Sequence, residues 1–242
     1  MANRVFTQAS PDAVCHTAAS RLMVTDPDFF DALGLETSEL GPTSGRIIDA
    51  LSKYGDSGEP NETVFSLAND TPLNIYQFLG QNPERARRFG AGMRFFTKDE
   101  GWNLKHLVAG FDWASIDHPG ATVIDMGGGQ GSVSQVLAKA TKNIKFAVFD
   151  LPGTVEQGRA ALPKEYDGRI EFKAHDFFTA QAPQIAPQVY LFRWIFHNWN
   201  DDYCVKILQN LLPSLSDGTR ILIYEYVLSE DPETRVTEKM GL

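Results

Sequence analysis

The fold class of this chain follows from one stretch, Thr122-Val123-Ile124-Asp125-Met126-Gly127-Gly128-Gly129-Gln130-Gly131. An apolar segment typical of a strand meets an acidic residue and then a glycine-rich turn. Behind the turn, apolar residues recur at helical spacing at Val133, Val136, Leu137 and Ala140. A strand, a tight glycine turn and a helix open a nucleotide-binding βα unit, because glycines allow unusual backbone angles and close approach of a ligand.

The glycine spacing separates two classes of ligand. Started at Gly127, the dinucleotide fingerprint G-x-G-x-x-G meets Ser132 in place of its third glycine; started at Gly129, it meets Ser134. The spacing therefore disfavours a nicotinamide dehydrogenase. The pattern D-x-G-x-G-x-G does fit, from Asp125 to Gly131, and resembles the first motif of class I methyltransferases, which bind S-adenosyl-L-methionine (SAM). On this motif alone, an ordinary glycine-rich loop without a ligand stays open.

The composition of the chain limits which classes of binding partner are expected. A chain of 242 residues predicts one large domain or a domain with an appended piece, and 43% hydrophobic with 22% charged residues is typical of soluble proteins. The net charge of −9 argues against nucleic acid. No apolar run is long enough for a membrane span, and residues 1–10 lack a signal core, so no membrane partner is expected. Cys15 and Cys204 lie far apart, which favours free thiols, no metal site and a cytoplasmic location.

The first half of the chain predicts helices. Ser10-Pro11-Asp12 indicates the beginning of a helix over residues 14–23. Further helices are expected near residues 27–30, 47–55, 72–79 and 83–96. In the last of these, Arg85, Arg87 and Arg88 are interpreted as a solvated face without a function.

Aromatic residues are dense just before the glycine-rich unit, at Phe95, Phe96, Trp102, Phe111 and Trp113. Core packing is the favoured interpretation of this set, and the wall of a substrate pocket is the alternative. His118-Pro119-Gly120 then separates the two halves of the chain.

From residue 121 onward, strand and helix patterns alternate, which predicts an α/β fold with a parallel sheet. Strands are expected at residues 121–125, 145–150, 170–174, 189–195 and 220–227, with a helix at 201–212. Acidic residues and one histidine fall at or just past the strand ends: Asp125, Asp150, Asp176, His197 and Glu225. This edge of an open sheet is where ligands bind. Singly, Asp150 could cap a turn and His197 could be a core histidine, but five such residues on five strands favour a site.

Four blocks occur in order: residues 125–131, Phe149-Asp150-Leu151-Pro152, His175-Asp176-Phe177-Phe178, and residues 193–201, Arg-Trp-Ile-Phe-His-Asn-Trp-Asn-Asp. Together they resemble the small-molecule O-methyltransferase family of plants and fungi, the caffeic acid type, which is SAM-dependent and needs no cation. The resemblance implies a Rossmann-like class I methyltransferase sheet in residues 116–242. It also implies that residues 1–115 form a helical dimerisation and substrate-lid segment, the remnant of a winged-helix region.

The resemblance assigns a cofactor role to each matching residue. Gly127 and Gly128 line the SAM site, and Asp150 binds the ribose hydroxyls, as suits a carboxylate that accepts two hydrogen bonds. Asp176 and Phe177 hold the adenine.

Arg193, His197 and Glu225 complete the implied site. Arg193 lies by the methionyl end of the cofactor. His197 is the general base toward a hydroxyl of an aromatic or polyketide-like secondary metabolite, and Glu225 orients its imidazole. A phenol with a pKa near ~10 needs a base, and histidine, with an ordinary pKa near ~6.5, can take the proton as the methyl group moves.

The chain also departs from the family. It is expected to be shortened at both ends, which would leave the strand at residues 220–227 with an unpaired edge and would weaken a homodimer. Asn198 stands where aspartate is commoner. The alternative function is a SAM-binding protein of the same fold that does not methylate, either a pericyclase or an inactive truncated homologue.

Overall fold

The computed structural model describes residues 4–181 and 186–227, and the chain divides into two compact units, Met1–Asn103 and Leu104–Leu242. Each unit is described by itself below.

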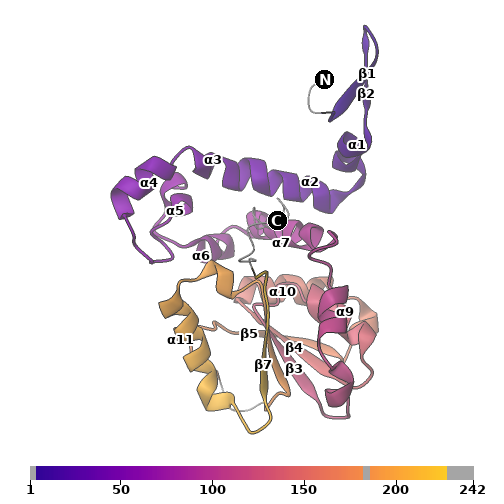
Figure 1. The fold of residues 1–242 in the computed structure, drawn as a ribbon, viewed down its shortest axis with the longest axis vertical. Helices are drawn as coiled ribbons and strands as arrows, with labels where there is room; N and C mark the ends of the chain where they lie inside the picture. The colour runs from indigo at the N-terminus through magenta and orange to yellow at the C-terminus, as the bar shows by residue number, and fades with distance from the viewer. Residues whose placement is uncertain (1–3, 182–185, 228–242) are drawn as a thin grey trace. The chain divides into compact units, whose positions relative to one another are not determined.

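The first unit consists of a β-hairpin and a series of short helices (Figure 1). Its elements are β1 (Phe6–Ser10), β2 (Ala13–His16), α1 (Ala18–Thr25), α2 (Pro27–Gly34), the π-helix η1 (Leu35–Leu40), α3 (Gly41–Ser44), α4 (Ile47–Tyr54), α5 (Val64–Ala68), α6 (Ile75–Gly80) and α7 (Pro83–Phe96).

The predicted helix over residues 14–23 was wrong in its first part. Residues 13–16 form β2, which pairs antiparallel with β1. Pro11 and Asp12 form the hairpin turn instead of a helix start. The helix begins at Ala18 because Thr17 and Ser20 cap each other's backbone N–H groups in a capping box.

The prediction that Arg85, Arg87 and Arg88 form a solvated face was also wrong. Arg87 binds Asp31 through two hydrogen bonds of 2.6 and 2.9 Å. Arg88 binds Glu39 at 2.9 Å, and Arg85 pairs with the same carboxylate. Asp31 and Glu39 are buried, and buried carboxylates need paired cations. The three arginines therefore fasten α7 to α2 and η1.

The second unit confirms the predicted α/β fold. Its elements are α8 (Lys105–Gly110), η2 (Trp113–Ile116), β3 (Thr122–Met126), α9 (Ser132–Ala140), β4 (Lys145–Asp150), α10 (Pro152–Ala161), η3 (Lys164–Tyr166), β5 (Ile170–Ala174), β6 (Val189–Arg193), η4 (Phe196–Asn198), α11 (Asp201–Leu211), η5 (Leu212–Ser214) and β7 (Arg220–Tyr224). The five strands lie in the order β5-β4-β3-β6-β7 and all pairs are parallel. All carboxyl ends therefore meet at one edge of the sheet.

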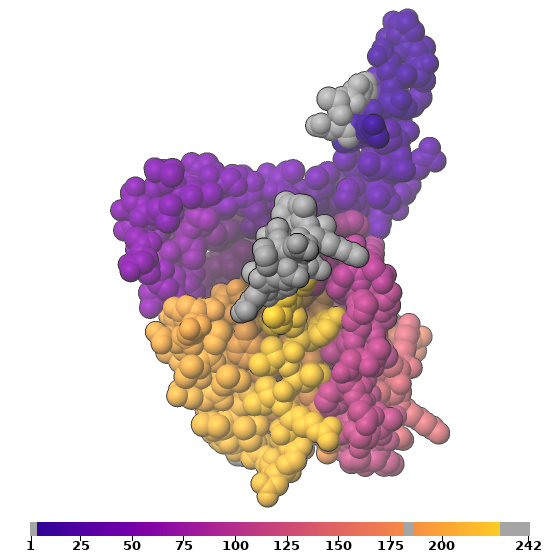
Figure 2. Space-filling view, in the orientation of Figure 1, coloured from indigo at the N-terminus to yellow at the C-terminus, as the bar shows by residue number. Residues whose placement is uncertain are grey.

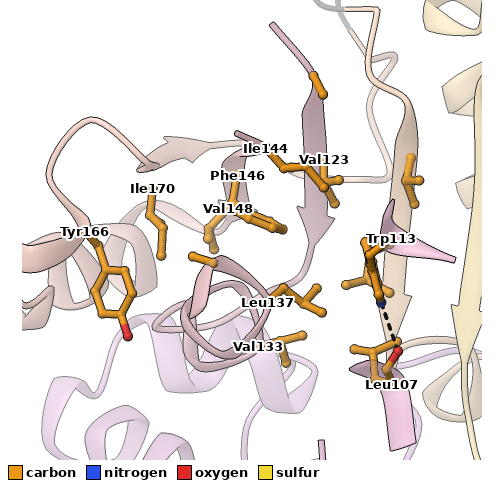
Figure 3. Packing of buried hydrophobic residues seen from close by; sticks show 14 of the residues in the cluster. Leu107, Trp113, Val123, Val133, Leu137, Ile144, Phe146, Val148, Tyr166 and Ile170 are labelled. Atoms are coloured by element: carbon orange, nitrogen blue, oxygen red, sulfur yellow. Dashed lines mark hydrogen bonds between the residues drawn. The ribbon is translucent and has the colours of Figure 1, made fainter. Parts of the chain in front are cut away.

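Two apolar layers cover the sheet. On one face, Val133 and Leu137 of α9 pack with Phe146 and Val148 of β4 (Figure 3). On the other face, Ile207 and Leu211 of α11 belong to a second cluster, together with Ile124, Met126, Tyr190 and Phe192. Because both faces are covered there, the inner strands β3, β4 and β6 are apolar and buried on both sides, as is typical of parallel sheets.

Of the aromatic residues that precede the glycine turn, Trp113 lies in the core, as predicted. The indole is buried, and its Nε1 donates a hydrogen bond of 3.0 Å to the carbonyl of Leu107 (Figure 3). Phe111 packs against the same cluster.

Strands β6 and β7 end two and three residues earlier than predicted, at Arg193 and Tyr224. Trp194 has a left-handed backbone with φ 55°, which cannot continue a strand. Within the described ranges, β7 pairs with β6 alone, and Figure 2 shows its yellow segment at the surface of the unit. Ile221 and Ile223 are exposed there.

Candidate functional site

The glycine turn between β3 and α9 has one open side. Gly127, Gly129 and Gly131 have φ of 67°, 60° and 77°, in the left-handed region. A Cβ on Gly129 would meet no described atom within 4 Å, so a ligand could lie against its backbone. A Cβ on Gly128 would lie 2.6 Å from Cγ of Asp125. The sequence motif contains Gly129, but the predicted cofactor contacts were Gly127 and Gly128.

Gly127 faces side chains of its own unit. A Cβ there would lie 2.5 Å from Cδ1 of Ile195 and 3.6 Å from Cε1 of Phe177. Gly127 and Phe177, two residues predicted separately as cofactor contacts, thus lie close together. Phe177 also contacts Phe178 and Trp199 at ring-centroid distances of 4.9 and 5.9 Å.

Asp150 ends β4 and holds the glycine turn. Its Oδ2 accepts the N–H of Gly129 at 2.8 Å, and its Oδ1 accepts the N–H of Leu151 at 2.7 Å. Burial raises the pKa of the Asp150 carboxyl above its ordinary value. The Thr154 side chain also donates to this carboxylate, so Asp150 caps a turn and keeps acceptor room for one further hydroxyl group.

A second carboxyl lies beneath the turn. Asp125 is buried, and its Oδ2 accepts the hydroxyl of Ser134 in the first turn of α9 at 2.8 Å. Burial raises the pKa of Asp125 to about 6, against the opposing effect of the Ser134 hydrogen bond and of the Arg193 charge. Asp125 therefore supports the turn from the inside.

Arg193, at the end of β6, carries donors without acceptors. Its Nε and Nη2 are buried, and neither has a hydrogen-bond partner within the described part of the chain. Burial lowers the pKa of Arg193 to about 10, so the guanidinium is charged at neutral pH. It stacks on the ring of Trp194 at 3.5 Å from the centroid. Buried unpaired N–H groups on a cation suit an anionic ligand group.

The loop after β5 carries two polar residues with different surroundings, Asp176 and His175. Asp176 is exposed, and its Oδ1 accepts the N–H of Phe178 at 2.9 Å, so it organises the loop. His175 was not predicted as a site residue. Its Nε2 is buried without a partner in the described residues, and burial lowers the pKa of its imidazole. Its place beside Asp176 at a strand end is the sequence signal that could have found it.

His197 and Glu225 form a pair at the same edge of the sheet. Nδ1 of His197 lies 2.7 Å from Oε2 of Glu225. Oε1 of Glu225 accepts the N–H groups of Ile195 and Phe196 at 2.7 and 2.9 Å. Burial raises the pKa of Glu225, but the hydrogen bond and charge of His197 and these two amides outweigh it, so the pKa is lowered overall. Glu225 is therefore a carboxylate, which accepts Nδ1–H and leaves the Nε2 lone pair of His197 free to take a proton.

The side chain of His197 is half exposed, so a substrate can reach it. Within residues 4–181 and 186–227, no three His, Cys, Asp or Glu side chains gather where they could hold a metal ion. No helix in these same ranges is long and apolar enough to cross a membrane.

A family model described as an O-methyltransferase domain matches residues 53–241. The chain is 36% identical to chlorophenol O-methyltransferase of Trichoderma longibrachiatum, covering 95% of this chain and 50% of that protein. It is 38% identical to O-methyltransferase VdtC of Byssochlamys spectabilis, covering 96% of this chain and 54% of that protein.

Among solved structures, human N-acetylserotonin methyltransferase in complex with SAM matches with a TM-score of 0.75 at 19% identity. The match covers 98% of this chain and 66% of that one, and it concerns the fold alone. The chain spans about half the length of the curated relatives it matches.

Proposed function

The chain belongs to the O-methyltransferase domain family, and from that premise we propose that it binds SAM and transfers a methyl group to a hydroxyl of an aromatic or polyketide-like secondary metabolite. The observation that carries this proposal is the contact of 2.7 Å between His197 and Glu225, at the sheet edge that also holds Asp150 and Arg193. The phenolic substrate in the name of the Trichoderma relative supports the same substrate class.

The residues at this edge fit SAM. Asp150 has remaining acceptor capacity for a ribose hydroxyl, and the open side of Gly129 allows the nucleoside to lie against the backbone. The unpaired Nε and Nη2 of Arg193 suit the methionyl carboxylate. Phe177 lies beside the turn, where it can cover the adenine, and Asp176 follows the next strand end. When bound, SAM supplies a methyl group on a positively charged sulfur, an electrophile with a good leaving group.

The part left to the chain is alignment and proton transfer. Nε2 of His197 would accept the proton of the substrate hydroxyl, and the oxygen freed of its proton would take the methyl group that bound SAM supplies, with S-adenosylhomocysteine as the leaving product. The imidazolium that forms is stabilised by Oε2 of Glu225 across the 2.7 Å contact. Since Glu225 is also tied to the backbone of Ile195 and Phe196, it holds the histidine at a fixed angle.

The test begins with calorimetric titration of the purified chain with SAM and with S-adenosylhomocysteine, followed by a methyl-transfer assay on a panel of phenols. We expect His197→Ala to lower the rate by roughly 10²–10⁴-fold, while the affinity for S-adenosylhomocysteine stays unchanged. No binding to the folded chain would overturn the proposal. Binding without transfer to any phenol would favour the non-methylating alternative.

Two further parts of the proposal concern the whole protein. We propose a homodimer, in which residues 1–115 form the dimerisation and lid segment. Supporting it, the described residues include thirteen exposed large apolar side chains, and eight of these belong to the first unit: Phe6, Val14, Leu22, Val24, Phe30, Ile47, Ile48 and Leu51. Light scattering after gel filtration would test the stoichiometry. Free thiols at Cys15 and Cys204 support a cytoplasmic location, which cell fractionation would test.

A further inference from the structure

The turn that carries His197 begins with a strained residue. Trp194 has φ 55°, which places a bulky aromatic residue in the left-handed region that glycine normally occupies. Its N–H donates to the carbonyl of Tyr224 at 3.3 Å, and its ring lies under the guanidinium of Arg193. Strain of this kind persists only where the surroundings hold it, and it concentrates at functional sites.

The side chain of Asn198 holds the carbonyl group of Trp194. Nδ2 of Asn198 donates a hydrogen bond of 3.0 Å to the carbonyl oxygen of Trp194. The bond closes a loop of five residues, with His197 inside it. The N–H of Asn198 also donates to the carbonyl of Ile195 at 3.1 Å, so both ends of the asparagine hold the turn. An aspartate carboxylate has no proton to donate here and would repel the carbonyl oxygen.

The closed loop fixes where the histidine lies. Two backbone amides inside it, those of Ile195 and Phe196, point at Oε1 of Glu225, and Nδ1 of His197 points at Oε2. Three donors can meet one carboxylate only if the backbone between Trp194 and His197 keeps its turn. The hydrogen bond from Asn198 to Trp194 therefore acts on His197 through the backbone and does not involve the substrate.

Building on the proposed function, we propose that Asn198 is a positioning residue for methyl transfer. Its bond to Trp194 holds the left-handed turn, and the turn sets the contact between His197 and Glu225. An ionised aspartate at this position could not donate the same bond.

The test is a double-mutant cycle. Asn198→Asp is nearly isosteric and removes the donor, and Trp194→Gly supplies a residue that adopts left-handed angles without restraint. With cofactor saturating, Asn198→Asp should lower kcat roughly 10–100-fold with KM unchanged, as expected for a misplaced catalytic group. In the Trp194→Gly background the same change should have little further effect. With glycine at position 194, the backbone adopts left-handed angles without the hydrogen bond from Asn198. Asn61→Asp breaks a matched amide bond of 3.2 Å to the carbonyl of Pro72 in the first unit and should leave kcat unchanged.

A second readout does not depend on activity. In the chain labelled with ¹⁵N-histidine, which has five histidines, the Nδ1–H proton of His197 can be assigned by comparison with His197→Gln. A hydrogen-bonded Nδ1–H signal is expected in the parent chain, and its loss is expected in Asn198→Asp. A signal unchanged in Asn198→Asp would overturn the proposal, even if the melting temperature falls.

The kinetic outcomes are equally decisive. A raised KM with kcat unchanged would mean that Asn198 contacts the substrate, and equal losses in both backgrounds would mean that it does not act through Trp194. Either result overturns the positioning role. If the parent chain binds cofactor but methylates no phenol, the proposed function fails, while the Nδ1–H signal still decides the role of Asn198.

Discussion

Asp125 is a carboxyl whose surroundings favour its protonated form. Burial raises its pKa from the ordinary 3.8 to about 6. A raised pKa in the folded state contributes stability that is fully present below pH 3.8 and is lost as the pH rises through 6. The shift corresponds to about 3 kcal/mol of unfolding free energy.

Asp125→Asn should therefore change the pH dependence of stability. The amide keeps an acceptor for the hydroxyl of Ser134 and carries no charge. We expect the unfolding free energy of the variant, relative to the parent, to rise by about 2–3 kcal/mol between pH 4 and pH 7. Urea unfolding at a series of pH values measures this difference, and a constant difference across the range would contradict the assignment.

A substitution at Gly128 tests how closely the glycine turn packs against Asp125. The Cβ of Gly128→Ala would lie 2.6 Å from the carboxyl carbon of Asp125, so either the turn or the acid must shift. We expect a loss of about 1–3 kcal/mol in unfolding free energy, together with weaker binding of S-adenosylhomocysteine. Gly153→Ala is the control: it lies in α10 with nothing within 4 Å of its Cβ position, and should be neutral or slightly stabilising.

At the scale of elements, Glu39 is one of the carboxylates that attach α7 to the preceding helices. Glu39 is buried and pairs with both Arg85 and Arg88. Glu39→Gln should lower the unfolding free energy of the first unit by about 1–3 kcal/mol, because two guanidinium groups lose their charged acceptor. Glu84→Gln removes an exposed partner of Arg87 and should change the stability clearly less than Glu39→Gln does. Equal effects in thermal unfolding followed by circular dichroism would count against a special role of Glu39.

The elements also show what local sequence can predict. The ranges of β4, β5 and α7 were confirmed because apolar periodicity and flanking Pro or Asp residues mark them locally. The hairpin was missed because Pro11-Asp12 is typical of both a turn and a helix start. The early end of β6 follows from the left-handed Trp194, which no local residue pattern announces.

The candidate site likewise combines residues that the sequence predicts with features that it does not predict. Asp150, His197 and Glu225 could be predicted because each follows a strand, and parallel strands bring their ends to one edge. The unpaired nitrogens of Arg193 and the open side of Gly129 could not, since both depend on which other segments pack nearby. The bond of Asn198 to Trp194 likewise exists only because the turn is left-handed.

At the scale of the whole molecule, we expect self-association to involve the exposed edge strand β7. In the part of the chain that is described, β7 pairs only with β6, and its side chains Ile221 and Ile223 are 39% and 49% exposed. An exposed apolar edge strand can pair with another copy, and a charge on the edge opposes this.

Ile223→Lys should therefore raise the concentration up to which the purified chain stays monodisperse, with the sheet intact because the side chain is already half exposed. Dynamic light scattering over a concentration series measures this. Val205→Lys is the matched control: it introduces the same charge at a side chain of α11 that is 50% exposed. If both variants improve solubility equally, net charge and not the strand edge is responsible. If only Ile223→Lys does, copies of the chain associate through β7, and the affinity for S-adenosylhomocysteine should stay unchanged because Asp150 and Gly129 lie on β4 and the turn after β3.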